Sequence, residues 1–293
     1  MKRLALILCL GILLGMAPMA SAAETIDNKG LQISPLRYYV TLNAGEQKTG
    51  NLVVANQTDK PMTITLSLQQ FSVADYSYDY RFKAPTNDWL KLEATQITLQ
   101  PHKSRTVMYQ IFVPSPSPSG GYYYTLLAST EMQTGGLTST VQAASLIYVT
   151  VNGELVRASE FKSSSLQHVS FGGPIRYTMA VKNTGNVHYF AYFSGKLQGR
   201  SARDITGTSH LLLPGAIRQV SGSMPAPLLP GIYRATYSYT TDTGTILTRT
   251  GRVVFIPPWS IALPLALILL GSFFYRRRKK HSQKIPAAQV DET

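Results

Sequence analysis

The sequence predicts an all-β protein, with two tandem immunoglobulin-like β-sandwiches followed by one C-terminal transmembrane helix. Between residues 31 and 256, short runs of alternating apolar and polar residues recur, with Gly, Pro, Asn and Asp between them. This pattern is typical of strands joined by turns, and many short strands at such spacing indicate sandwiches. Two apolar segments stand outside this region, one at each end of the chain.

The N-terminus has the order of a secretory signal peptide. Basic residues at 2–3 precede an apolar run over 4–16, and three small residues follow at 20–22. This combination predicts a signal at 1–22 and a mature chain that begins at Ala23. The apolar run is too short for a retained membrane anchor.

Cys9 is the only cysteine, and it lies inside the apolar run of the predicted signal. The mature chain therefore has no cysteine, which excludes disulfides, thiolate zinc sites and cysteine nucleophiles. An exported protein without disulfides suggests a bacterial or archaeal surface more than an animal one.

The C-terminal apolar segment has the composition of a membrane span. It carries no charge, and it would extend roughly 25 Å as a helix, close to the thickness of the hydrocarbon core. Trp259 and Tyr275 stand at its edges, as aromatic side chains do at membrane interfaces. We predict a helix at 258–275, a cytoplasmic basic tail at 276–293 and an ectodomain outside the cell membrane. The membrane anchor then consists of Trp259, Tyr275, Arg276, Arg277, Arg278, Lys279 and Lys280.

The formal charge of +13 is unevenly distributed. The predicted signal contributes +2 and the tail +4, which leaves 13 − 2 − 4 = +7 for the ectodomain. Residues 23–152 hold nine basic and nine acidic side chains, whereas residues 153–257 hold eleven basic and four acidic ones. A basic membrane-proximal half would attract anionic lipid head groups or acidic wall polymers, and the alternative is a merely soluble basic domain. No nucleic acid partner is expected outside the cell.

We expect one sandwich in each half of the ectodomain, at 23–152 and 153–257, because each half has the length of a typical domain. The expected strands are 37–42, 51–56, 62–68, 96–99, 106–113, 122–128, 140–151, 175–182, 189–197, 216–223, 232–239 and 246–255.

The two halves also share turn motifs in the same order, which indicates two domains of one general type. Chance similarity between sandwiches is the alternative. The paired segments are 54–56 with 181–183, 99–101 with 212–214, and 118–122 with 230–233.

These motifs carry a resemblance to a known family. With ISP at 33–35, NAGE at 43–46 and GGY at 120–122, the first half resembles the peptidoglycan-binding domain of WxL-interacting proteins of Gram-positive bacteria. With KNTGNVH at 182–188 and PGIY at 230–233, the second half is similar to bacterial cell-surface immunoglobulin-like modules. The resemblance implies a membrane-anchored surface protein that engages peptidoglycan or another wall polymer, or a surface protein partner.

No residue pattern predicts chemistry. The ectodomain histidines have no second histidine or carboxylate at metal-ligand spacing, and there is no GxSxG nucleophile motif. We therefore expect no catalytic residue, no metal and no cofactor. A carboxylate pair assembled in space, as in glycan-active enzymes, is the alternative.

The stretch DYSYDYRF at 75–82 is the most suggestive candidate for ligand binding. Its aromatic residues recur at period two, so a strand would place them on one face, where they could stack on sugar rings or anchor a partner. Core packing is the alternative. Tyr123 should oppose its two tyrosine neighbours and lie at the surface. The candidate ligand-binding residues are Tyr76, Tyr78, Tyr80, Trp89 and Tyr123.

Three functions follow from these observations. The first is a non-catalytic cell-surface binding or scaffold protein. The second is a chaperone-like assembly factor that offers a strand edge to a secreted client. An exposed, unpaired edge would favour it, and a blunted edge would count against it. The third is a glycan-active enzyme.

Overall fold

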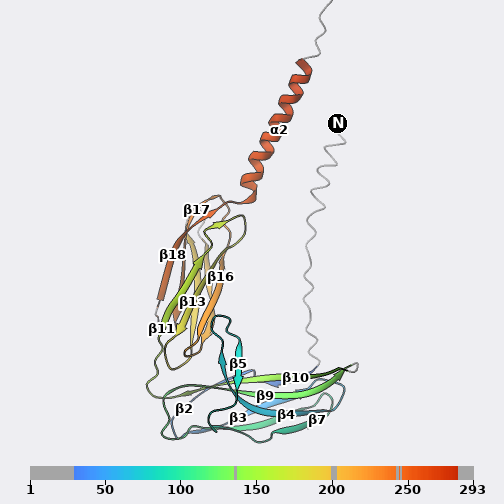
Figure 1. Ribbon diagram of the computed structural model, residues 1–293, viewed down its shortest axis with the longest axis vertical. Helices are drawn as coiled ribbons and strands as arrows, with labels where there is room; N and C mark the ends of the chain where they lie inside the picture. The colour runs from blue at the N-terminus through green and yellow to red at the C-terminus, as the bar shows by residue number, and fades with distance from the viewer. Residues whose placement is uncertain (1–29, 135–136, 199–202, 242–243, 245, 283–293) are drawn as a thin grey trace, which may run out of the picture.

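The computed structural model describes residues 30–134, 137–198, 203–241, 244 and 246–282. The predicted signal at 1–22 lies outside these residues. The described chain forms two β-sandwiches and one helix (Figure 1). The all-β prediction with a C-terminal helix is therefore confirmed.

Two sheets form the first sandwich. Its strands alternate buried and exposed side chains, as in β3, where Leu52 and Val54 point into the core. The smaller sheet has the order β1 (Leu31–Ser34), β3 (Gln47–Asn56), β8 (Ser104–Phe112) and β6 (Leu90–Leu92). The larger has the order β2 (Arg37–Leu42), β10 (Leu137–Val151), β9 (Gly120–Thr134), β4 (Met62–Val73) and β5 (Tyr80–Lys83), and β7 (Gln96–Leu99) also pairs with β4.

The second sandwich has the same two-layer construction around a separate core of aromatic and aliphatic side chains. One sheet has the order β11 (Ser159–Leu166), β13 (Ile175–Asn183) and β16 (Ile217–Met224). The other has the order β12 (Val169–Ser170), β18 (Ile246–Phe255), β17 (Gly231–Thr241), β14 (Tyr189–Gln198) and β15 (Arg203–Leu212).

Helix α2 (Pro258–Ser282) follows β18 after two residues. Over Pro258–Arg276 it is long and apolar enough to cross a membrane. The helix does not end at Tyr275, the last residue of the predicted span, but continues through the basic cluster to Ser282. Arginine and lysine are good helix formers, so the change in composition does not end the helix.

Two buried asparagines occupy matching positions in the two sandwiches. The side-chain N–H of Asn56 donates to the carbonyl of Leu99 (3.2 Å), and that of Asn183 donates to the carbonyl of Leu212 (3.0 Å). The side-chain oxygen of each accepts the backbone N–H two residues later, at 2.9 Å and 2.8 Å. Both asparagines are 0% exposed. The shared turn motifs therefore form the same hydrogen-bonded corner twice.

A third apolar cluster joins the two sandwiches. Phe71, Leu146 and Tyr148 of the first pack with Leu213 and Ala216 of the second. We call this contact the elbow. Apart from β5, the labelled strands of the first sandwich run across the long axis of the molecule, and those of the second run along it (Figure 1).

Candidate functional site

The hairpin of β9 and β10 extends beyond β2, the strand that pairs with the other side of β10. The two strands pair from Leu137↔Thr134 to Val151↔Gly120. On its other side, β10 pairs with β2 only from Leu146 to Val151. Residues 140–144 of β10 therefore have β9 on one side and no described strand on the other. We call residues 140–144 the open edge.

Pro35 explains why the pairing stops there. The first strand of the chain splits at Pro35, since β1 pairs with β3 in one sheet and β2 pairs with β10 in the other. The carbonyl of Leu36 accepts the backbone N–H of Leu146 at 2.9 Å, which is where β2 begins to cover β10. Upstream of that bond, β1 lies in the opposite layer and leaves the edge of β10 uncovered.

An apolar pocket of about 510 Å³ lies beside the open edge, between β10 and β1. Leu36 is 67% exposed and Val53 is 38% exposed in its wall, and Ala143 packs partly against the core. The complete lining is Leu31, Gln32, Ile33, Ser34, Leu36, Val53, Ala55, Ala143 and Ala144. An extended peptide on the open edge could pair its backbone with β10 and place alternate side chains in this pocket.

The open edge lacks the usual protection against pairing. Its sequence is TVQAA, without a charged residue or proline. Natural edge strands are commonly blunted by lysine, proline, bulges or inward-pointing charges, because unpaired backbone groups invite another strand. Its composition therefore leaves this edge suitable for strand addition.

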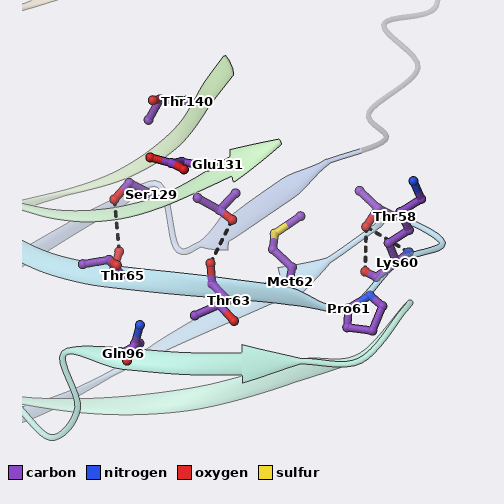
Figure 2. Close-up of a pocket in the computed structure, with 11 residues that line it drawn as sticks. Thr58, Lys60, Pro61, Met62, Thr63, Thr65, Gln96, Ser129, Glu131 and Thr140 are labelled. Atoms are coloured by element: carbon purple, nitrogen blue, oxygen red, sulfur yellow. Dashed lines mark hydrogen bonds between the residues drawn. The ribbon is translucent and has the colours of Figure 1, made fainter. Parts of the chain in front are cut away.

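A larger, polar pocket of about 740 Å³ is lined mainly by β4, β9 and the turn at 58–61 (Figure 2). Many of its hydroxyls already donate to backbone carbonyls, including Ser129 to Thr65 (3.4 Å) and Thr130 to Thr63 (2.8 Å). Glu131 is the one carboxylate among its lining residues, so the pocket offers no pair of carboxylates. In the described part of the chain, no group of three or more His, Cys, Asp or Glu could hold a metal ion.

The stretch Asp75–Phe82 is not one strand, contrary to the expectation from its period of two. Tyr76 and Tyr78 have φ angles of 65° and 63° and lie in a turn, and β5 begins only at Tyr80. The turn reaches the second sandwich. The hydroxyl of Tyr78 accepts the backbone N–H of Leu213 at 2.8 Å, and the guanidinium of Arg218 lies 4.0 Å from its ring centre.

The remainder of this turn also belongs to the elbow. The N–H of Tyr76 donates to the carbonyl of Ile217 (2.8 Å), and the N–H of Ile217 donates to the carboxylate of Asp75 (2.8 Å). Burial raises the pKa of Tyr78 to about 12, against the opposing effects of its Leu213 hydrogen bond and of Arg218. Tyr78 is thus a neutral contact between the two sandwiches.

Tyr123 opposes its two neighbours, as expected, but it faces the second sandwich and not the solvent. Its hydroxyl accepts the backbone N–H of His188 at 3.0 Å, and burial raises its pKa. Trp89 packs on Tyr122, with ring centres 4.3 Å apart. Tyr80 lies on the edge strand β5, where it is 41% exposed and its ring stacks on that of Phe82. The five candidate aromatics thus do not form one platform.

The residues predicted to form the membrane anchor lie on α2. Trp259 is 48% exposed and Tyr275 is 70% exposed. Arg276 is also exposed, and Arg277, Arg278, Lys279 and Lys280 continue the same helix. The remaining residues of the predicted tail, 283–293, lie outside the described residues.

The fold and the site define a protein with two tandem immunoglobulin-like sandwiches, an open sheet edge and one C-terminal apolar helix. No family model matches the chain, and no curated protein matches it. Among solved structures, it is similar to the class 5 fimbriae chaperone CfaA, with a TM-score of 0.42, 12% identity, and 77% of this chain and 99% of that chain covered.

Two further structures are similar at the same identity. The E. coli chaperone DraB has a TM-score of 0.38, with 76% of this chain and 97% of that chain covered at 12% identity. The Pseudomonas aeruginosa CupB2 chaperone has a TM-score of 0.37, with 75% and 98% covered at 12% identity. At this identity the likeness concerns the fold alone.

Proposed function

We propose that this protein is a membrane-tethered, non-catalytic assembly factor that holds an extended segment of a client protein on the open edge of β10. The observation that carries the proposal is the uncovered stretch 140–144 beside an apolar pocket. Backbone hydrogen bonds would supply affinity, and the pocket would select apolar side chains at alternate positions.

The proposal places both sandwiches outside the cytoplasm. The signal-like N-terminus and the basic cluster after the apolar helix support this orientation. The client is then an exported protein with an unpaired strand of alternating apolar residues.

A peptide with alternating valine and threonine tests the mode of binding. Fluorescence anisotropy measures its binding to the full chain in detergent micelles. Two N-methylated versions accompany it, each blocking every second amide, in opposite registers. We expect one version to lose binding and the other to keep it, because only alternate amides of an added strand face β10. Equal binding of both would contradict strand addition.

Protein variants locate the peptide. We expect Ala143→Lys to abolish binding, because it puts a charge in the apolar pocket at a half-buried edge position. Gln142→Lys is the matched control, since its side chain is exposed on the opposite face of the same strand. If both lysine variants bind as the parent does, the peptide site lies elsewhere.

One observation favours a second candidate, peptidoglycan recognition by the first sandwich. Tyr80 and Phe82 are 41% and 43% exposed, and their rings stack with an interplanar angle of 14°. Such a pair could stack on sugar rings, as the resemblance to WxL-interacting proteins also implies. Binding to purified sacculi that persists at high salt and weakens in Tyr80→Ala would support it. Unchanged binding in that variant would count against it.

A further inference from the structure

The end of the second sandwich nearest α2 carries a group of exposed apolar side chains. They come from the strands β12, β17 and β18 and from the loops at 171–174 and 225–230, and we call them the apolar collar. The collar consists of Val169 (44% exposed), Phe171 (67%), Leu228 (66%), Leu229 (43%), Ile232 (71%) and Val254 (38%).

Strand pairing places three of the collar residues side by side. Ile232 pairs with Val254, and Val254 pairs with Val169, so three exposed apolar side chains form one row across β17, β18 and β12. The loop that holds Phe171 touches the start of the helix, since a Cβ placed on Gly172 would lie 2.5 Å from Cδ of Pro258. The collar therefore lies at the end of the second sandwich from which α2 emerges (Figure 1).

A row of basic side chains lies next to the collar on the same sheet face. Arg234 and Arg252 are exposed and paired with each other, two residues along from the row of Ile232 and Val254. Two residues of a strand span about 7 Å, which matches the depth of about 5–10 Å that apolar faces reach below lipid head groups.

We propose that the collar inserts into the interfacial layer of the membrane that α2 enters, with the two arginines at the level of anionic lipid head groups. The continuity of the chain indicates that lipid is what covers the collar. The two residues between β18 and α2 span at most about 7 Å, so a helix that crosses from Pro258 holds the collar at the bilayer surface. Exposed apolar side chains beside a basic row fit that surface by burial and by charge.

Lipid-depth quenching on the full chain in lipid nanodiscs tests the proposal. A fluorophore is attached to Val169→Cys, with Cys9→Ser wherever the signal is retained. We expect strong quenching by spin-labelled lipids. Val156→Cys is the matched control, because Val156 is 43% exposed and precedes β11, whose first residue pairs with Asn183 at the opposite end of β13. We expect little quenching there.

Two results would overturn the insertion. The first is equal quenching at Val169 and Val156. The second is a probe at Val169 that is shielded from water but not quenched by lipid, because it would assign the collar to a second copy of this chain. Neither result involves a client peptide, so this test is separate from that of strand addition.

Lipid charge tests the arginines. Near an anionic surface, each arginine raises the equilibrium constant for insertion of the collar by about fivefold. We expect quenching at Val169 to rise when anionic lipid is added to a zwitterionic nanodisc, and Arg234→Gln with Arg252→Gln to remove that rise. Quenching that does not depend on lipid charge would overturn the head-group contact.

Discussion

The buried asparagine corners provide the sharpest test of the relation between the two sandwiches. Asn183→Ala removes side-chain bonds to two buried carbonyls, those of Val187 (2.9 Å) and Leu212 (3.0 Å), and to the N–H of Gly185 (2.8 Å). At about 1 kcal/mol for each backbone group left without its partner, the variant should lose about 3 kcal/mol of stability. For a domain of this size, that corresponds to a fall in Tm of about 12–24 °C.

Asn56→Ala should cost less, about 2 kcal/mol, because two of its three carbonyl partners are only partly buried and water can replace the lost donor. Calorimetry of the full chain in detergent measures both variants. Asn51→Ala is the control, since Asn51 lies exposed on the same strand as Asn56. A Tm within about 4 °C of the parent for Asn183→Ala would refute the reasoning, because it would mean a loss below about 1 kcal/mol.

Three further predictions concern the elbow and the first core. Tyr78→Phe leaves the backbone N–H of buried Leu213 without its acceptor, so hydrogen exchange at Leu213 should accelerate by about tenfold, as a loss of about 1.4 kcal/mol implies. Since the folded protein holds the Tyr78 proton up to a pKa of about 12, whereas an unfolded tyrosine loses it near 10, stability should fall as pH rises from about 10 to 12. Denaturant titrations should show a shallower fall for Tyr78→Phe, and an identical slope would contradict this assignment. A Cβ on Gly50 would lie 2.2 Å from the buried ring of Tyr109. Gly50→Ala should therefore lower the free energy of unfolding by about 1–3 kcal/mol. An unchanged midpoint of denaturation would contradict that clash.

Local patterning predicted most of the strands. The segments 37–42, 96–99 and 246–255 are strands with these same bounds. In each, alternation and flanking turn residues are enough to define the element. Strand β11 was not predicted, because its serine-rich sequence SEFKSSSL has weak apolar alternation.

The candidate aromatics show where local patterning fails. The period of two at 76–82 fits a strand, yet the turn at Tyr76 and Tyr78 is held by contacts with Leu213 and Ile217, more than 130 residues away in the sequence. No local pattern carries that information. The open edge was equally hidden, because it depends on where β2 begins to pair with β10.

The crosswise arrangement of the two sandwiches sets the direction of anything added to β10. The second sandwich continues the line of α2, and β10 runs across that line, held there by the elbow (Figure 1). A polypeptide captured on the open edge would lie flat over the lipid, at a height given by the length of one sandwich. In the proposed function, the protein would then hold the bound segment parallel to the membrane, where it faces neighbouring proteins in the same membrane.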